Sequence, residues 1–208
     1  MERSVFTAEL RAMMGDMTMG TPPLIEGYAA VFNQPSLILY SAFREIIMPG
    51  AFAESLANDD IRSLWNHNPD LVMGRVSNGT LRMLEDDYGL HIENNPPDTC
   101  AGRDAVTSIG RKDVNQMSFM FDALVDDWSQ DDTGQIVRSL YKVKLYEVSP
   151  VTFPAYPQTV VGVRGTDNCV LPKMPDWVQA RLASNDAEPA QVRMALRRRR
   201  LNYYLMQS

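Results

Sequence analysis

Only two side chains can supply an imidazole, because His67 and His91 are the only histidines in the chain. A serine hydroxyl is a weak nucleophile at neutral pH and needs an adjacent base, usually a histidine that a third group holds in place. His67 lies in a polar segment after an apolar run, where reactive side chains are commonly displayed. Ser118 lies in the apolar run 117–121. There it is either a hydrogen-bonded core hydroxyl, which the residue alone favours, or a positioned nucleophile.

Glu147 is the second unusual polar residue, because it precedes the uncharged segment 148–157. The strands expected to carry Ser118 and Glu147 flank a polar turn and predict a long antiparallel hairpin. With the turn centred near residue 131, Ser118 lies opposite about Lys144. Glu147 is then about three residues, or roughly 10 Å, further along the strand. The spacing permits a Ser-His-Glu triad and leaves it open.

Two other chemistries receive less support. Cys100 could act as a nucleophile with His67, but a reactive thiolate needs an electropositive setting, and the first basic residue after it is Arg103. A metal site would need His67 and His91, which form no HxH or HExxH pair. No glycine-rich phosphate loop is present. We therefore expect no cofactor and no metal.

The elements that position these residues are mostly strands. Apolar or alternating runs predict strands over 25–32, 43–48, 61–65, 72–76, 80–84, 89–93, 117–125, 136–148 and 159–163. Asn78-Gly79, between two of these runs, is typical of a β-hairpin turn. Helices are predicted over 51–58 and 98–109. Together the elements indicate an α+β, mainly β fold, with an antiparallel sheet closed or nearly closed into a barrel.

Charge divides the chain into an acidic body and a basic tail. Residues 165–208 hold seven basic and four acidic side chains; since the whole chain carries −6, residues 1–164 carry −9. The tail predicts helices over 176–183 and 190–206, the second with Arg197–Arg200. We expect an N-terminal arm (1–23), a body (24–164) and a basic helical tail (165–208). A solvated helix and a docking helix for an acidic partner both stay open for the tail.

Composition excludes several classes of protein. A hydrophobic fraction of 45% with 22% charged residues predicts a packed core rather than a disordered chain. The sequence contains no run of about 18 apolar residues, so no membrane span is predicted. The N-terminal residues lack the apolar segment of a secretory signal. The net negative charge argues against general nucleic-acid binding. Two cysteines outside any CxxC spacing are typical of free thiols in a reducing cytosol.

An ordered set of short motifs resembles the tailed-phage prohead maturation proteases. The motifs are EGYAAVFN (26–33), RE through PGAF (44–52), LWNHNP (64–69), LVMGRV (71–76), GTLR (79–82), PDT (97–99), DVNQMSF (113–119) and YEVSPVTFPAY (146–156). Each string alone is weak, but the ordered set is specific and covers about residues 24–164. The resemblance implies a barrel like that of the herpesvirus assembly proteases.

The same resemblance implies a serine endopeptidase and a role for each site residue. His67 is the general base, Ser118 the nucleophile and Glu147 the third member, which orients His67. The herpesvirus relatives use a second histidine in that third role, so His91 is the alternative to Glu147. Backbone N–H groups should form most of the oxyanion hole, with Arg75 or Arg111 as candidates to assist.

The chain departs from the family at two positions. Met120 follows the serine-phenylalanine pair, where the family usually has glycine, and Lys112 replaces the glycine of the usual Arg-Gly-Asp. Both changes bear on the backbone near the expected nucleophile.

By resemblance, the partners are the major capsid protein and the scaffold. The enzyme would cut the scaffold, or the N-terminal scaffold-like segment of the major capsid protein, during procapsid maturation, and would also remove its own tail. It would act inside the procapsid, in the cytoplasm of the infected bacterial host. The herpesvirus analogy suggests a homodimer, and no membrane or specific nucleic-acid partner is expected. The alternative is a catalytically inactive scaffold or assembly protein that keeps the protease fold.

Overall fold

The computed structural model describes residues 2–6, 10–13, 15, 23–36, 38–39, 42–152 and 172–185. The chain divides into two compact units, residues 1–172 and 173–208. Of the second unit, the structure describes helix α3 (Asp176–Asn185), which confirms the helix expected over 176–183. The strand expected over 159–163 and the helix expected over 190–206 lie outside the described residues.

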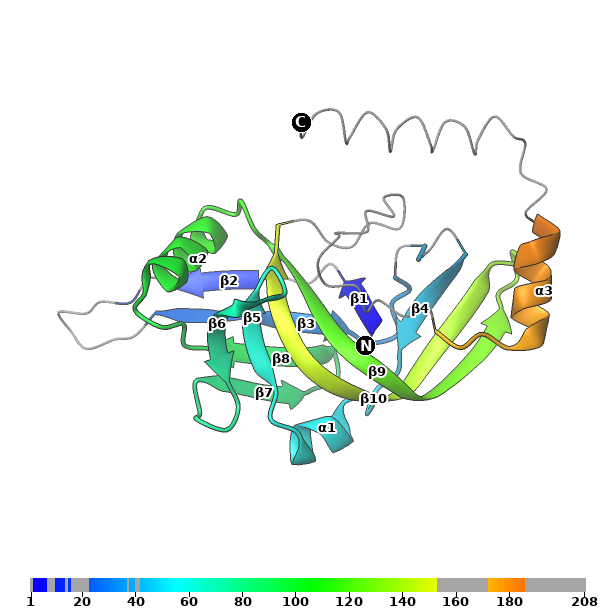
Figure 1. The fold of residues 1–208 in the computed structure, drawn as a ribbon, viewed down its shortest axis with the longest axis horizontal. Coiled ribbons are helices and arrows are strands. Elements are labelled where there is room, and N and C mark those ends of the chain that lie inside the picture. Colours follow the sequence, from blue (N-terminus) through cyan, green and yellow to red (C-terminus); the bar gives the residue numbers. More distant parts are fainter. Residues whose placement is uncertain are drawn as a thin grey trace. The chain divides into compact units, whose positions relative to one another are not determined.

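The first sheet of the larger unit has six strands and is mixed. Its order is β1 (Glu2–Phe6), β9 (Gln116–Gln130), β10 (Ile136–Val151), β5 (Arg62–Trp65) and β6 (Asn68–Arg75), and β4 (Phe43–Ile47) also pairs with β10. β9 and β10 are antiparallel, whereas β4 and β5 run parallel to different parts of β10. Figure 1 shows the long β9–β10 hairpin curving from β5 at one end to β4 at the other.

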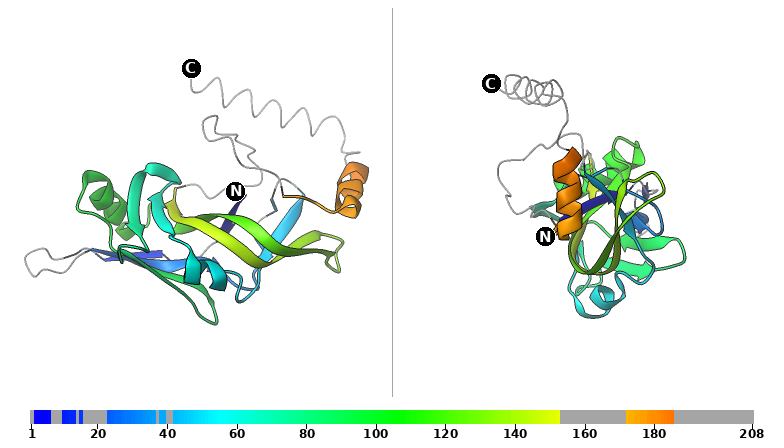
Figure 2. Two further views of the ribbon diagram at one scale, coloured as in Figure 1. Left: turned by 60° about the horizontal axis from the view of Figure 1, so that its bottom comes forward. Right: turned by 90° about the vertical axis from the view of Figure 1, so that its right-hand side faces the viewer.

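The second sheet has four antiparallel strands. Its order is β2 (Leu10–Met13), β3 (Leu24–Val31), β8 (Gly89–Asn94) and β7 (Leu81–Glu85). The larger unit also contains the helices α1 (Ala53–Asn58) and α2 (Cys100–Gly110). One buried apolar cluster joins both sheets and α2, with Ile25, Ile92, Phe119, Val148 and Ile109 among its members. Figure 2 shows the two sheets from two further sides.

The expected α+β, mainly β composition is confirmed, but the antiparallel sheet closed or nearly closed into a barrel is wrong for the described strands. The strands form two open sheets, and the first of them is mixed. Apolar and alternating runs predict where strands lie, but they do not specify which strands pair. Parallel pairs such as β4–β10 and β5–β10 join segments far apart in sequence, so no local turn marks them.

The hairpin expected at Asn78-Gly79 is also wrong. β6 belongs to the first sheet and β7 to the second, so the segment between them carries the chain from one sheet to the other. The residues still form a tight turn: Gly79 has a φ of 74°, and its amide donates to the carbonyl of Val76 at 2.9 Å. Asn-Gly therefore predicted the local turn correctly and the strand pairing incorrectly.

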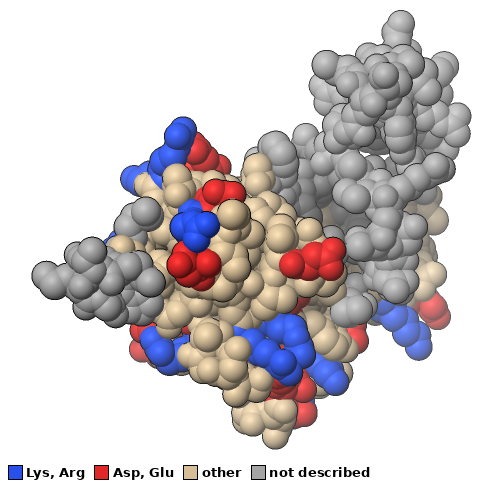
Figure 3. Space-filling model, turned by 60° about the vertical axis from the view of Figure 1, so that its left-hand side comes forward, with Lys and Arg blue, Asp and Glu red and all other residues tan. Residues whose placement is uncertain are grey.

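Two further observations concern the helices and the surface charge of the described residues. No helix among them is long and apolar enough to cross a membrane. Acidic and basic side chains are interspersed on the face that Figure 3 shows.

Candidate active site

His67 lies at the tip of the β5–β6 hairpin. Trp65 pairs with Asn68, so Asn66 and His67 form a two-residue loop. Both loop residues have positive φ, 52° for Asn66 and 59° for His67. Two-residue hairpin loops of type I′ require this conformation at both central positions. Asn and His are among the residues other than glycine that enter it most readily, so the local sequence suits the turn.

This turn is tied to the end of β10. The backbone amide of Asn66 donates to the carbonyl of Pro150 at 3.0 Å. Its side-chain oxygen accepts from the amide of Thr152 at 2.8 Å, and its side-chain nitrogen donates to the Thr152 hydroxyl at 3.3 Å. Asn66 therefore fixes the position of the neighbouring His67 against β10.

An extra residue in β10 determines the face on which Glu147 lies. Leu145 pairs with Phe121, but Glu147 pairs with Met120, so Tyr146 is the extra residue of a β-bulge. Leu145 and Phe121 belong to the apolar core. Side chains alternate along a strand, so without the bulge Glu147 would share the core face with Leu145. The bulge places it on the opposite face.

On that face Glu147 contacts His67. The Nδ1 atom of His67 lies 2.5 Å from Oε1 of Glu147, and the two side chains are 12% and 5% exposed. An imidazole that donates from Nδ1 to a carboxylate carries its lone pair on Nε2. The pair can therefore accept a proton at Nε2 while the carboxylate holds the ring.

Ser118 lies on the same face of the first sheet. It is fully buried and pairs with Ser149 of β10 on one side and with Val5 of β1 on the other. Its neighbours Met117 and Phe119 belong to the core, so Ser118 lies on the other face. Glu147 is two residues before Ser149 and shares that face. Residues 67, 118 and 147, which are far apart in sequence, thus come from adjoining strands of one sheet.

The expected register of the β9–β10 hairpin is wrong. Ser118 lies opposite Ser149 instead of Lys144, because the loop spans 131–135 and the strands contain bulges. Lys144 pairs with Asp122. Glu147 is consequently nearer to Ser118 than the sequence predicted, two residues from its partner instead of three.

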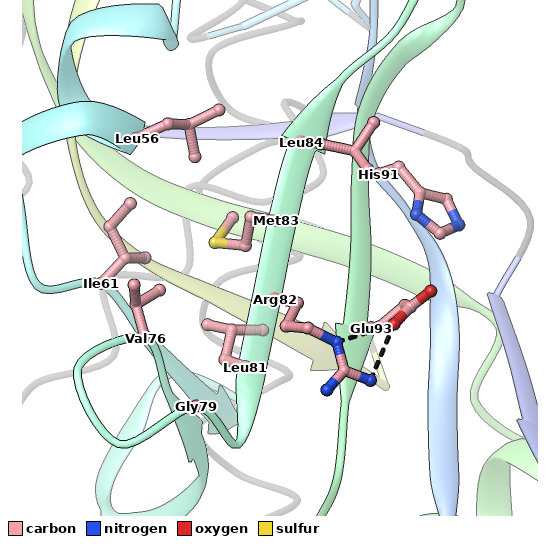
Figure 4. Close-up of a pocket in the computed structure, with 10 residues that line it drawn as sticks. All are labelled: Leu56, Ile61, Val76, Gly79, Leu81, Arg82, Met83, Leu84, His91 and Glu93. Atoms are coloured by element: carbon pink, nitrogen blue, oxygen red, sulfur yellow. Dashed lines mark hydrogen bonds and ion pairs between the residues drawn. The ribbon is translucent and has the colours of Figure 1, made fainter.

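His91 lies elsewhere, on β8 of the second sheet. Its ring is 5.1 Å from that of Tyr28, measured between centroids. It also lines a hollow of about 560 Å³, which is drawn in Figure 4. The apolar lining of the hollow consists of Leu56, Ile61, Val76, Leu81, Met83 and Leu84. Arg82 donates to Glu93 at 2.9 Å beside them. His67, Ser118 and Glu147 are all absent from the lining. The structure places Glu147 against His67 and His91 in the other sheet.

The alternative nucleophile, Cys100, is exposed at the start of α2. The guanidinium of Arg103 donates to its Sγ at 3.5 Å. The hydroxyl of Thr99 caps the same helix by accepting from the amide of Gly102. Among the described residues, no group of three His, Cys, Asp or Glu side chains could hold a metal ion.

The two arginines considered for the oxyanion hole are each bonded to an aspartate. Arg75 donates from Nε to Asp60 at 2.7 Å, and this hydrogen bond holds the pKa of Asp60 well below its ordinary value. Arg111 pairs with Asp113 at 2.8 Å.

The two departures from the family differ in their structural consequence. Lys112 has a φ of 67°, the left-handed conformation that glycine adopts most readily. It ends α2: its amide donates to the carbonyl of Ile109, and that of Asp113 donates to Ser108. This pattern is a Schellman motif, whose left-handed position is usually glycine. Met120 lies within β9 and has no positive φ.

Sequence reasoning missed Ser149. Its hydroxyl donates to Oε2 of Glu147 at 2.5 Å and accepts from the backbone amide of His67 at 3.2 Å. The signal was available, since residues i and i+2 of a strand share a face and Ser149 is two residues after Glu147.

A histidine bonded to a buried carboxylate, on strands adjoining one that carries a serine, is an arrangement that serine hydrolases use. A family model described as caudovirus prohead serine protease matches residues 8–169. The chain belongs to this family, which confirms the resemblance.

One relative and one solved structure illustrate the similarity. The chain is 30% identical over 143 residues to the prohead protease of Enterobacteria phage HK97. This match covers 67% of the chain and 59% of that relative, less than two thirds of the relative's length. Among solved structures, the bacteriophage T4 capsid assembly protease matches with 10% identity and a TM-score of 0.46. That match covers 74% of this chain and 100% of the other.

Proposed function

We propose that the protein is a serine endopeptidase in which Ser118 is the nucleophile, His67 the general base and Glu147 the residue that orients His67. The 2.5 Å contact between His67 Nδ1 and Glu147 Oε1 is the observation that carries this proposal. It fixes the ring at a site with little solvent, on strands that adjoin the one bearing Ser118. Family membership supports the same chemistry.

The reaction is acyl transfer through two steps. Ser118 Oγ attacks the peptide carbonyl carbon while His67 Nε2 takes its proton. The C–N bond then breaks as His67 gives this proton to the departing amine. In the second step water attacks the acyl ester, His67 takes a proton from the water, and Ser118 leaves with that proton. His67 must be neutral to begin, because only the neutral imidazole has a lone pair on Nε2 that can accept the proton of Ser118.

The proposed substrate is the capsid assembly. The protease cuts the scaffold, or the N-terminal scaffold-like segment of the major capsid protein, inside the procapsid in the infected host. Self-removal of the basic tail, residues 165–208, belongs to the same proposal. The match to the prohead serine protease family and the relative named as a prohead protease support this assignment.

Intact mass measurement after co-expression with the capsid gene of the same phage tests the proposal. Wild-type protein should give defined fragments of the capsid protein, and of itself, that are absent with Ser118→Ala. Ser139→Ala, a change in the distant part of β10, serves as the matched control and should leave the fragments unchanged. Identical uncut masses for the wild type and Ser118→Ala, inside well-formed procapsids, would favour the inactive scaffold protein instead.

A further inference from the structure

Ser149 connects three parts of the candidate active site. It is fully buried, and it lies directly opposite Ser118 in the register of β9 and β10. Its Oγ is 2.5 Å from Oε2 of Glu147 and 3.2 Å from the backbone nitrogen of His67. A serine hydroxyl has one hydrogen to donate and two lone pairs with which to accept. The donated bond goes to Glu147, and the bond from His67 uses one lone pair.

These two bonds constrain both members of the His67–Glu147 pair. Because Ser149 holds Oε2, the carboxylate cannot rotate freely and its Oε1 atom faces the ring of His67. The second bond holds the backbone of the residue that bears the ring, in a turn that already requires a positive φ. Hydrogen bonds to charged groups are stronger than those between neutral groups, so the bond to Glu147 is the more important of the two.

We propose that Ser149 is a positioning residue for proton transfer: it fixes the Glu147 carboxylate and the His67 backbone so that the ring presents Nε2 to the nucleophile. This inference rests on the proposed proteolytic role of His67 and Glu147. Ser149 acts through these two residues and has no role in bond breaking itself.

The test combines kinetics with NMR of the folded full-length protein. Ser149→Ala removes the hydroxyl and should lower kcat about tenfold to a hundredfold, with KM nearly unchanged. The Nδ1 proton of an imidazole bonded to a carboxylate gives a low-field signal. With only two histidines in the chain, His91→Gln assigns the signal of His67. That signal should shift or broaden in Ser149→Ala.

Ser63→Ala is the matched control. Ser63 is also fully buried and lies on β5, but it pairs with Val148, whose side chain is in the core, so it lies on the other face from Glu147. Its loss should leave kcat and the His67 signal unchanged. If Ser149→Ala does not fold, Ser149→Cys fills a similar space with a weaker donor and should show the same changes in smaller degree.

Each result decides the proposal. Unchanged kcat and an unchanged His67 signal in Ser149→Ala would overturn it, and so would a lower kcat with an unchanged signal. A wild-type protein without proteolytic activity would contradict the proposed function alone. The signal would then still show whether Ser149 positions the His67–Glu147 pair.

Discussion

Two buried carboxylates lie at opposite ends of β10, and the side chains that they contact differ. Glu147, on β10, contacts the imidazole of His67. Glu45, on β4, contacts the guanidinium of Arg138 of β10 at 2.9 Å. Both pairs are largely closed to solvent, with side chains 12% and 5% exposed in the first and 3% and 2% in the second. Burial alone therefore does not distinguish a site for chemistry from a structural contact.

The chemistry of the partner makes the distinction. A guanidinium stays charged at every pH that a folded protein tolerates, and its fork of donors suits fixed carboxylates. Arg138 also donates to Asp126 at 2.6 Å, and Asp126 accepts from the indole of Trp128 at 3.1 Å. This network joins β4 to the hairpin. An imidazole instead gains and loses a proton near neutral pH, so the Glu147 end suits proton transfer.

Replacing Glu147 by Gln should have the largest effect on activity. The amide keeps a similar shape but favours the wrong tautomer of His67, so kcat should fall about ten-thousandfold. The free energy of unfolding should change far less than in the Arg138 variant described next, because no buried charge loses its partner. Peptide cleavage rates and urea unfolding of the same sample check both statements. A variant that keeps a tenth of its activity would remove Glu147 from the proposed triad.

Replacing Arg138 by Met should lower the stability of the fold and leave the activity nearly unchanged. Breaking a buried ion pair leaves a carboxylate without that partner and should lower the free energy of unfolding by about 3–5 kcal/mol. The double variant with Glu45→Leu should recover part of the loss, and kcat of the folded enzyme should stay near the wild-type value. Urea unfolding provides the measurement. A loss below about 1 kcal/mol would show that this pair contributes little beyond packing.

Tyr146 is the extra residue of the bulge that places Glu147 on the face opposite the core. Its hydroxyl donates to Asp122 at 2.7 Å, and this hydrogen bond raises the pKa of Tyr146 to about 12. The folded state holds the phenol proton more tightly than the unfolded chain, whose ordinary pKa is 10.0. The resulting stability is therefore complete below that pH and is lost as the pH rises toward 12.

Tyr146→Phe removes this contribution. At neutral pH it should lower the free energy of unfolding by about 1 kcal/mol. As the pH rises above 10, the free energy of unfolding of the variant should fall less than that of the wild type. Urea unfolding at several alkaline pH values gives both quantities, and identical pH dependence in the two proteins would contradict the assignment.

Lys112→Gly should have the smallest effect and should stabilise the protein. A left-handed conformation costs a residue other than glycine about 1–2 kcal/mol. Glycine offsets part of that gain because its unfolded chain is more flexible, by roughly 0.5–1 kcal/mol. A gain of about 0.5 kcal/mol should result, measured by thermal unfolding. A loss would mean that the lysine side chain stabilises the end of α2 in some other way.

Local sequence patterns predicted much of the fold. Apolar runs and turn residues located β3, β4, β5, β8, α1 and α2 within a few residues. Strand partners were less predictable, since β6 and β7 flank an Asn-Gly turn and still join different sheets. The N-terminal strands β1 and β2 were not predicted, because no clear alternating run marks them.

The candidate site was predictable in composition and only partly in geometry. Residues 67, 118 and 147 were predicted as the site from spacing and family resemblance, and they come from adjoining strands of one sheet. The extra residue at Tyr146 and the resulting register could not be derived, because a bulge leaves no reliable mark in a single sequence. Ser149 was overlooked because a serine inside an apolar run is usually a core hydroxyl.

Labelling with a fluorophosphonate, followed by peptide mapping, tests most directly whether Ser118 is activated by the His67–Glu147 pair. The serine oxygen attacks phosphorus, fluoride leaves, and the base takes the proton. We predict one adduct, on Ser118, that forms far more slowly in His67→Gln and Glu147→Gln and at the wild-type rate in Arg138→Met. No adduct on Ser118, or an equal rate without His67, would contradict this prediction.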